Sequence, residues 1–274
     1  MKLSETLYAQ VQDIWLRYLS HPFVTEMAHG TLPKEKFRYY MLQDYLYLQD
    51  YVKIFAAMIQ KAEDFEQIRF LCGEMSATID ETFRTHLPYM KRLGISEQEI
   101  ACATAHIDSS AYSHYMICEA QAGDVLTGLV ALLNCSWSYA YIAEKTVEAY
   151  PEAVNDESYG SWFAGYVSPE YKKTNQALID RIDALAESID EKKLVTCARS
   201  SKSAVFLIFA SGTWCTPWAS AELLPCTNYA KFPRPSYGRG NFFTVRGRLA
   251  KMYKEAARLS GFFVYLVITH SAVR

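Results

Sequence analysis

The chain has 274 residues, enough for one or two domains with a substantial core, and half of these residues are apolar. The net charge is −2, and no uninterrupted apolar run approaches the roughly 18–20 residues that cross a bilayer, which argues against a membrane-spanning protein. The first residues lack the layout of a secretory signal, and the seven scattered cysteines without a CxxC are typical of reduced thiols. We therefore expect a cytoplasmic protein whose twenty tyrosines favour an interior pocket for a flat polar ligand.

The apolar pattern from residue 3 to about 190 is helical nearly throughout. A first stripe ends near Pro22, because proline cannot continue a helix, and the turn at 30–33 precedes a helix at about 34–60. Further helices are expected at about 64–92, 97–120, 123–149 and 169–190, with a stop-and-cap signal at 94–97. Strand-like alternation is absent, so the sequence predicts an all-α bundle with a ligand site where helices face each other.

The character of the sequence changes after Lys193. Residues 1–193 carry 17 Lys and Arg against 28 Asp and Glu, whereas residues 194–274 carry 11 against two. Residues 203–210 form a short apolar block with strand-like composition, four prolines interrupt residues 217–235, and 246–259 has the composition of a basic helix. The basic residues are dispersed rather than clustered, so they favour nucleic-acid binding only weakly.

Two helical segments carry the candidate chemistry. Cys135 and Tyr139 lie four apart in an apolar, aromatic stretch, which places them on one face of a buried helix. Such a thiol is either a nucleophile in a pocket or plain core, and most buried thiols are inert. Asp44 lies among large apolar and aromatic residues, where a carboxylate needs a buried partner or a ligand.

Four segments in order across about 190 residues resemble the thiaminase II (TenA) family. They are His21-Pro22-Phe23 with Gly30-Thr31-Leu32-Pro33, Tyr39 to Tyr47, Ala131 to Tyr139, and Tyr159 to Tyr166. The resemblance implies a haem-oxygenase-like helical bundle over residues 1–193, and relatives of this family are usually tetramers. It also implies hydrolysis of an aminopyrimidine, or cleavage of thiamin, in thiamin salvage.

The resemblance assigns roles to individual residues of this sequence. Cys135 is similar to the family's nucleophile, and Asp44 to the carboxylate that holds the pyrimidine. The phenols that resemble the pocket lining are Tyr47, Tyr112, Tyr139 and Tyr166. Each of these tyrosines, taken without the resemblance, is also consistent with ordinary core.

The chemistry of an aminopyrimidine suits these residue types. One carboxylate can engage a protonated ring nitrogen and the neighbouring amine through paired, charge-assisted hydrogen bonds. Ring protonation makes a ring carbon electrophilic, so a thiolate can add to it, provided that the thiol pKa is lowered or its proton is removed locally. Asp44 and Tyr47 lie three apart on one helix and can face one cavity. This chemistry requires no metal or cofactor, and the sequence suggests none.

The resemblance fails in the tail. The family's bundle closes with a helix that bears a Tyr-Glu pair and a Phe-Trp-Asp-Met-like run, and that Glu is the general acid/base beside the thiol. The corresponding region, 200–220, contains no acidic residue. Codons can be chosen for residues 210–220 such that the same bases, read in another frame from the last base of the Ala210 codon, encode Phe-Trp-Asp-Met-Val-Tyr-Thr-Met-Gly-Glu. Our hypothesis is that residues 194–274 are a frameshifted tail, with the closing helix missing and activity impaired.

Two alternatives stay open. A di-iron or haem bundle needs two Glu-x-x-His pairs and further glutamates, whereas the chain offers only Glu26-x-x-His29. A non-catalytic pyrimidine-binding or regulatory relative would keep the pocket without the chemistry. We assign His21 to capping or packing, and His86 and His114 to structure rather than catalysis.

Overall fold

The computed structural model describes residues 2–210, with side chains as far as Leu207, and every regular element in this range is helical. The elements are α1 (Leu3–Leu19), α2 (Pro22–Ala28), α3 (Lys34–Ile59), α4 (Phe65–Glu81), the π-helix η1 (Thr82–His86), α5 (Leu87–Arg92), α6 (Glu97–Cys102), α7 (Ile107–Ala122), α8 (Val125–Ala149), the 3-10 helix η2 (Pro151–Asn155), α9 (Gly160–Val167), α10 (Pro169–Leu185) and α11 (Glu191–Ala210). The predicted all-α class is confirmed. The expectations for residues 211–274, including the loop, the basic helix and the shifted-frame segment, lie outside the described residues.

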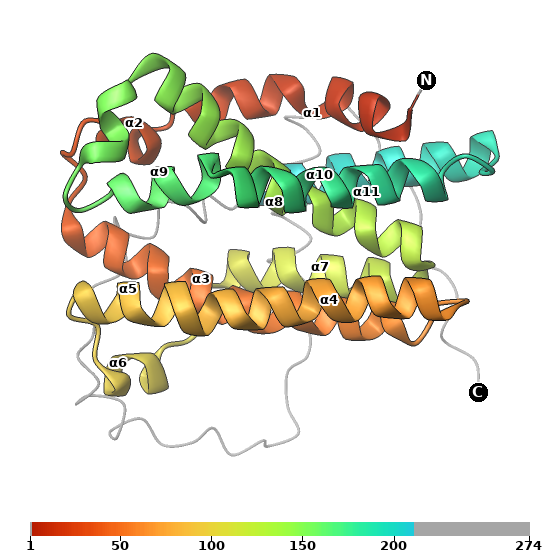
Figure 1. The fold of residues 1–274 in the computed structure, drawn as a ribbon, viewed down its shortest axis with the longest axis horizontal. Coiled ribbons are helices and arrows are strands. Elements are labelled where there is room, and N and C mark those ends of the chain that lie inside the picture. The colour runs from red at the N-terminus through yellow and green to blue at the C-terminus, as the bar shows by residue number, and fades with distance from the viewer. Residues whose placement is uncertain (1, 211–274) are drawn as a thin grey trace, which may run out of the picture. The chain divides into compact units, whose positions relative to one another are not determined.

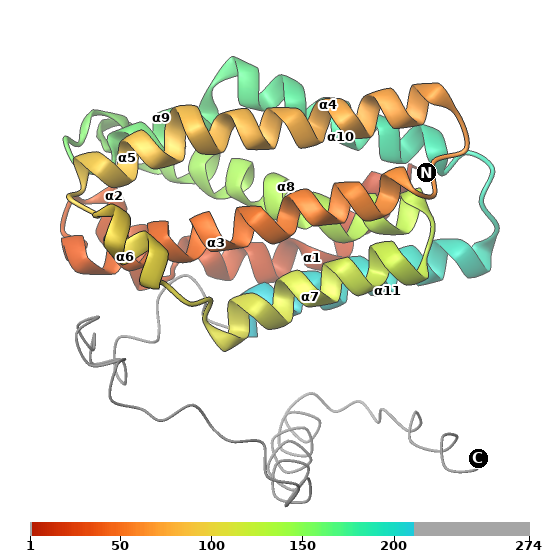
Figure 2. The same cartoon turned by 90° about the horizontal axis from the view of Figure 1, so that it is seen from below.

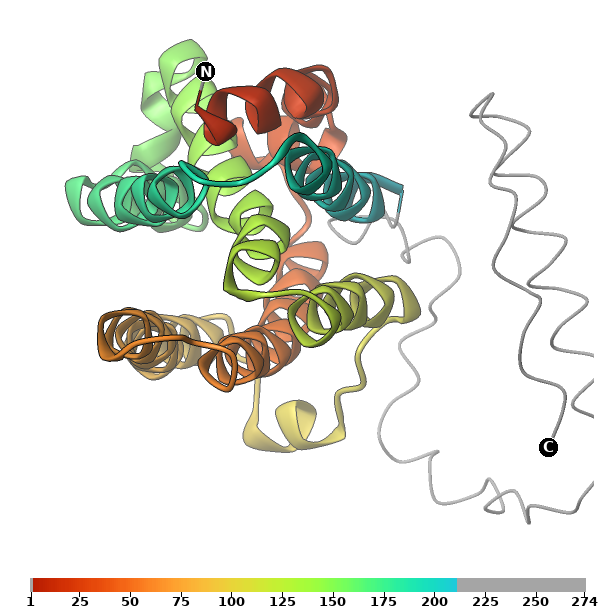
Figure 3. The same cartoon turned by 90° about the vertical axis from the view of Figure 1, so that its right-hand side faces the viewer.

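Helix α8 is the centre of the bundle. Figures 1 and 3 show it between a layer of α1, α10 and α11 and a layer of α3, α4 and α7. Figure 2 shows α4 and α10 on the same side of α8, with α7 and α11 on the other side. Because α8 is apolar around most of its circumference, it must be covered on all sides.

The length and composition of α8 would also suit a membrane span, the only such helix among the described residues. However, 78% of its most apolar window is buried inside the bundle. Its apolar character is therefore explained by packing within the protein.

The predicted turn signals act as expected. Gly30 and Gly94 have φ angles of 67° and 71°, in the left-handed region that favours glycine. Ser96 caps α6 in a capping box with Glu99, and His21 caps α2 by accepting a hydrogen bond from the Phe23 backbone at 3.2 Å. These caps fix where the helices begin.

The structure corrects three of the predicted elements. The helix expected at 97–120 is two helices, α6 and α7, separated by a non-helical segment from Ala103 to His106. The helix expected at 64–92 contains the π-helix η1, whose wider turn has no signature in apolar spacing. The interpretation of residues 203–210 as strand-like is wrong, because they form the end of helix α11, and a short apolar run does not by itself distinguish a strand from a helix.

Helix α11 crosses the predicted boundary after residue 193 and closes the bundle against α1, α7 and α8. Asn134 on α8 donates hydrogen bonds to the carbonyl and the hydroxyl oxygen of Ser201, at 3.2 and 3.1 Å. The residues of α11 that are buried in this interface are Cys197, Ala198, Ser200, Ser201, Ala204 and Val205. The helical unit therefore continues past residue 193.

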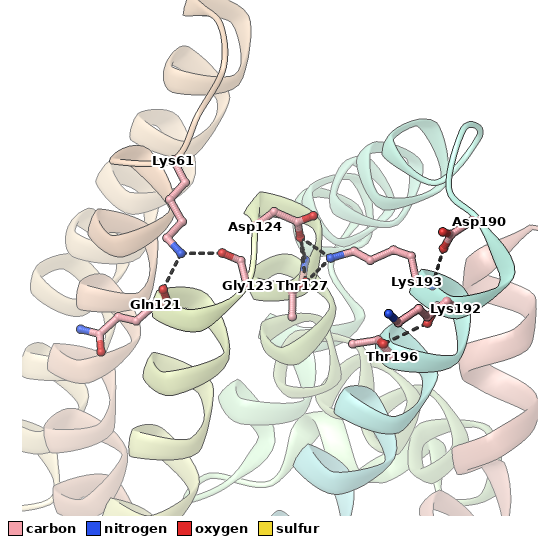
Figure 4. Close-up of polar contacts among 9 residues, drawn as sticks. All are labelled: Lys61, Gln121, Gly123, Asp124, Thr127, Asp190, Lys192, Lys193 and Thr196. Atoms are coloured by element: carbon pink, nitrogen blue, oxygen red, sulfur yellow. Dashed lines mark hydrogen bonds and ion pairs between the residues drawn. The ribbon is translucent and has the colours of Figure 1, made fainter. Parts of the chain in front are cut away.

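Two lysines hold the turn between α7 and α8 (Figure 4). Lys61 at the end of α3 donates to the carbonyls of Gln121 and Gly123. Lys193 on α11 lies 2.7 Å from Asp124 Oδ1, and Asp124 also caps α8 by accepting from the Thr127 backbone at 2.9 Å. The start of α8 is thus tied to both layers of the bundle.

Candidate active site

A cavity of about 110 Å³ lies between α3, α4, α8 and the α9–α10 region. It is lined by Asp44, Tyr47, Leu48, Tyr51, Phe55, Glu74, Ala77, Thr78, Glu81, His86, Cys135, Ser136, Tyr139, Tyr166, Tyr171, Thr174, Asn175 and Leu178. The lining combines an apolar and aromatic surface with a few ionisable groups, which is the usual composition of a small-molecule site.

The structure brings five of the six predicted site residues to this cavity. Asp44 and Tyr47 come from α3, Cys135 and Tyr139 from α8, and Tyr166 from α9. The sixth residue, Tyr112 on α7, is not part of the lining and instead stacks on Tyr47, with ring centroids 5.7 Å apart and an interplanar angle of 7°. Tyr112 therefore supports the Tyr47 ring from behind.

The Cys135 thiol is strongly held in its protonated form. Burial raises its pKa to about 12, and the charges of Asp44 and Glu81 add to this increase. The neighbouring Tyr47 hydroxyl acts in the opposite direction but is the smaller effect. The sequence predicted that a thiolate would need a lowered pKa or local removal of its proton, and this environment leaves only the second route.

Asp44 has a buried partner that the sequence analysis did not identify. Its Oδ2 lies 2.8 Å from Nε2 of His86, and the two side chains are each 9% exposed. Burial alone would lower the pKa of His86, but the hydrogen bond and charge of Asp44, with the charge of Glu81, raise it. The need of Asp44 for a partner was predictable, whereas the identity of His86 depended on the π-helix that carries it.

Phenols close the end of the cavity near Asp44. The rings of Tyr139 and Tyr166 lie 5.0 Å apart, and Tyr166 meets Tyr171 edge to face at 4.9 Å. Burial raises the pKa of all three hydroxyls, so they are neutral donors and acceptors. Tyr171 donates a hydrogen bond to the carbonyl of Ser136 at 3.1 Å, which fixes its ring against α8.

Two glutamates on α4 also line the cavity, and the sequence analysis missed them. Glu74 and Glu81 lie seven residues apart, two turns along one face of the helix. Burial raises the pKa of Glu74, and it raises that of Glu81 although Glu81 is exposed at the rim. Among the described residues, α11 contributes no lining residue, so the carboxylates available to the cavity come from α3 and α4.

The fold defines the class of protein to which this chain belongs. A TenA homologue from P. horikoshii OT3 superposes with a TM-score of 0.70 at 26% identity, over 78% of this chain and 99% of that one. A domain with a haem-oxygenase-like fold from Shewanella denitrificans superposes with a TM-score of 0.65 at 15% identity, over 85% and 99% of the two chains. The protein is therefore an all-α, haem-oxygenase-like helical bundle.

The sequence narrows the class to a family. Residues 8–204 match the TENA/THI-4/PQQC family, and the chain belongs to this family. It is 36% identical to an aminopyrimidine aminohydrolase of Halalkalibacterium halodurans over 193 residues, 70% of this chain and 86% of the relative. It is 32% identical to the aminopyrimidine aminohydrolase of Helicobacter pylori over 194 residues, 71% and 89% of the two. The predicted resemblance to the TenA family is confirmed, and the match extends into α11.

Proposed function

We propose that this protein is an aminopyrimidine aminohydrolase, a hydrolase of carbon–nitrogen bonds in thiamin pyrimidine salvage, with Cys135 as its nucleophile. The observation that carries the proposal is that the Cys135 thiol and the Asp44 carboxylate line one cavity with Tyr47, Tyr139 and Tyr166. Two relatives at 36% and 32% identity bear the name aminopyrimidine aminohydrolase, which supports the same reaction.

Binding of the ring is the task of Asp44. One carboxylate can accept hydrogen bonds from a protonated ring nitrogen and from the exocyclic amine beside it, and such charge-assisted pairs are the strong ones. The flat ring then lies among the phenols of Tyr139 and Tyr166, which supply stacking surface and neutral hydroxyls. Ring protonation at Asp44 draws electrons from the ring carbon that the thiol attacks.

The reaction then proceeds by addition of the thiol, loss of the amine, addition of water and departure of the thiol. Cys135 sulfur forms a bond to the ring carbon while its proton passes to a local base, and the displaced electron pair moves onto the ring nitrogen. That pair returns to expel the amine from the substituent carbon, and the amine takes up the proton and leaves as ammonia. Water adds its hydroxyl to the same carbon, its remaining proton returns to sulfur through the base, and departure of the thiol restores the aromatic ring.

The base in this scheme comes from the cavity. Because the pKa of Cys135 is raised to about 12, sulfur must lose its proton as it attacks rather than beforehand. Glu81 is the carboxylate on α4 whose charge acts on Cys135, Asp44 and His86 together. We assign the proton transfer to Glu81, in place of the glutamate that the resemblance leads one to expect in residues 200–220.

The test is turnover of the aminopyrimidine by the full chain and by Cys135→Ser. We expect release of ammonia by the unmodified chain and a loss on the order of 10³-fold or more in the variant, because the nucleophile is removed. Hydroxymethylpyrimidine binding should survive in Cys135→Ser, since Asp44 is unchanged. Equal turnover by both proteins would exclude Cys135 as the nucleophile.

A second candidate is a non-catalytic pyrimidine-binding relative, and the raised pKa of Cys135 is the observation that favours it. A thiol with a pKa of about 12 is inert unless a base lies close to it. Binding of hydroxymethylpyrimidine by the full chain without release of ammonia from the aminopyrimidine would identify this function. The turnover assay, run with thiamin and the aminopyrimidine supplied together, shows which of the two substrates the protein prefers.

Assembly and location belong to the same proposal. We propose a homotetramer in the cytoplasm. In the isolated chain, α4, η1 and α7 expose Phe65, Phe83 and Ile107, with exposures of 87%, 65% and 75%. Contact between subunits would remove such surface from water. Light scattering at several concentrations measures the assembly, and a monomer at every concentration would contradict it.

A further inference from the structure

His86 is a buried ionisable side chain in the cavity lining that the proposed reaction leaves without a task. It is 7% exposed, and its Nε2 lies 2.8 Å from Oδ2 of Asp44. Nε2 cannot accept the proton of Cys135 in this arrangement, because it is engaged with the carboxylate. Its Nδ1 is buried and has no hydrogen-bond partner, so the polar side-chain contact that the structure gives this ring is the one with Asp44.

The π-helix explains how His86 reaches this position. In an α-helix, residues five apart differ by roughly 500° of rotation, so they lie about 140° apart around the helix axis. Glu81 and His86 are five apart and both line the cavity. The wider turn of η1, Thr82–His86, brings the fifth residue back above the first, and π-turns of this kind are common at functional sites.

A carboxylate without such a partner would not hold one orientation. The terminal torsion of an aspartate side chain is broad and roughly two-fold, so its own rotamer preference does not set the plane of the carboxylate. A donor fixed in the protein and bonded to one oxygen removes this freedom. With Oδ2 bonded to His86, the plane of the carboxylate is set, and Oδ1 together with the second lone pair of Oδ2 can accept the paired hydrogen bonds of the ring.

We propose that His86 is a positioning residue that orients the Asp44 carboxylate for the pyrimidine ring. This role rests on the proposed function, since it presumes that Asp44 binds an aminopyrimidine. His86 can donate from Nε2 in its neutral and its protonated form alike, so the role does not depend on its charge. The groups that face it are Asp44 from α3 and Glu81 from the end of α4.

Two amide substitutions separate the hydrogen bond from the bulk of the ring. Glutamine carries its amide nitrogen where Nε2 of histidine lies, whereas asparagine carries it at the position of Nδ1. We therefore expect His86→Gln to retain the donor to Asp44 and His86→Asn to lose it. Both variants replace a ring by an amide, so each serves as the control for the other.

The readouts are the dissociation constant of hydroxymethylpyrimidine, by calorimetry on the full chain, and kcat and KM for the aminopyrimidine. We expect His86→Gln to bind within about threefold of the unmodified chain. His86→Asn should bind roughly 10- to 100-fold more weakly, the cost of a lost hydrogen bond to a charged group. The change should fall mainly on KM, because orientation by Asp44 serves the bound substrate and the transition state together.

The outcomes are distinct. Rescue by Gln and not by Asn, with equal melting temperatures, supports the positioning role. Equal binding by both variants, whether strong or weak, overturns it, because the position of the amide donor would then have no effect. If the unmodified chain itself binds no hydroxymethylpyrimidine, the proposed function fails, and this role fails with it.

Discussion

The two walls of the cavity are built in different ways. The inner wall consists of Asp44, Tyr47, Cys135, Tyr139 and Tyr166, whose helices α3, α8 and α9 pack into the core. The outer wall is the face of α4 that carries Glu74, Ala77, Thr78 and Glu81, and both Ala77 and Glu81 are exposed. The cavity therefore opens toward solvent on the side of α4.

This difference assigns separate tasks to the walls. Groups on the inner wall are held by packing, so they can keep the ring and the sulfur in a fixed relation, which is the source of large rate effects. Groups on the outer wall are in contact with water, and water can partly replace a lost proton carrier there. Substitutions on the inner wall should accordingly have larger effects than substitutions on the outer wall.

After the removal of the nucleophile in Cys135→Ser, the largest effect is expected for Asp44→Asn. The amide cannot hold a protonated ring nitrogen as an ion pair, and it cannot promote ring protonation, so kcat/KM should fall by about 10²- to 10⁴-fold. Steady-state kinetics on the aminopyrimidine measure this loss, with circular dichroism to show that the bundle still folds. A loss smaller than that of an outer-wall variant would reverse the comparison.

A smaller effect is expected for Glu81→Gln, with Glu74→Gln as the matched control on the same helix. Glu81 acts electrostatically on Cys135, whereas Glu74 acts on Tyr51 farther along the cavity. We expect kcat to fall roughly 10- to 100-fold for Glu81→Gln, at or below the low end for a general acid or base. Glu74→Gln should change kcat by less than about threefold. The reverse order would move the proton transfer to Glu74.

The inner wall was also the part of the site that the sequence could predict. Cys135 and Tyr139 share a helical face, and Asp44 stands out as a carboxylate among apolar residues, but these patterns are also consistent with ordinary core, and the resemblance to the TenA family assigned the three residues to one site. The outer wall could not be predicted in this way. Glu81 lies in a charged, amphipathic stretch that is typical of a solvated surface, and apolar spacing does not reveal the π-turn that brings His86 inward.

Prediction of the helices from the sequence was limited in the same way, because it depended on local signals. Caps and glycines marked the turns at Gly30 and Gly94, because those residues have a local physical preference. The apolar run at 203–210 had no such signal, and only its neighbours α1 and α8 decide that it is a helix. Tertiary packing decides where local preference is weak.

The pH dependence of alkylation tests the electrostatics of the inner wall. Because the pKa of Cys135 is raised to about 12, the thiolate fraction should increase about tenfold per pH unit between pH 7 and 10. Its rate of reaction with iodoacetamide should increase in proportion, measured by mass spectrometry of the Cys135 peptide, with the exposed Cys118 as an internal reference. A plateau near pH 8 would show that the cavity lowers the pKa of the thiol instead.

The smallest effect is expected at the outer end of the α8–α11 contact, where Lys193 meets Asp124. Burial opposes ionisation of Asp124, but hydrogen bonds from Lys193 and Thr127 lower its pKa to about 2. Since this value lies below that of the unfolded chain, the pair stabilises the fold above about pH 4, and the contribution is lost as the pH falls toward 2. Lys193→Met should reduce the free energy of unfolding by about 0.5 kcal/mol at pH 7, because the Asp124 side chain is 58% exposed and water screens the pair. Urea denaturation of the unmodified chain and of Lys193→Met at pH 7 and pH 3 measures the free energy of unfolding. The difference in this free energy between the two proteins should be smaller at pH 3. An equal difference at both pH values would mean that Lys193 acts through packing rather than charge.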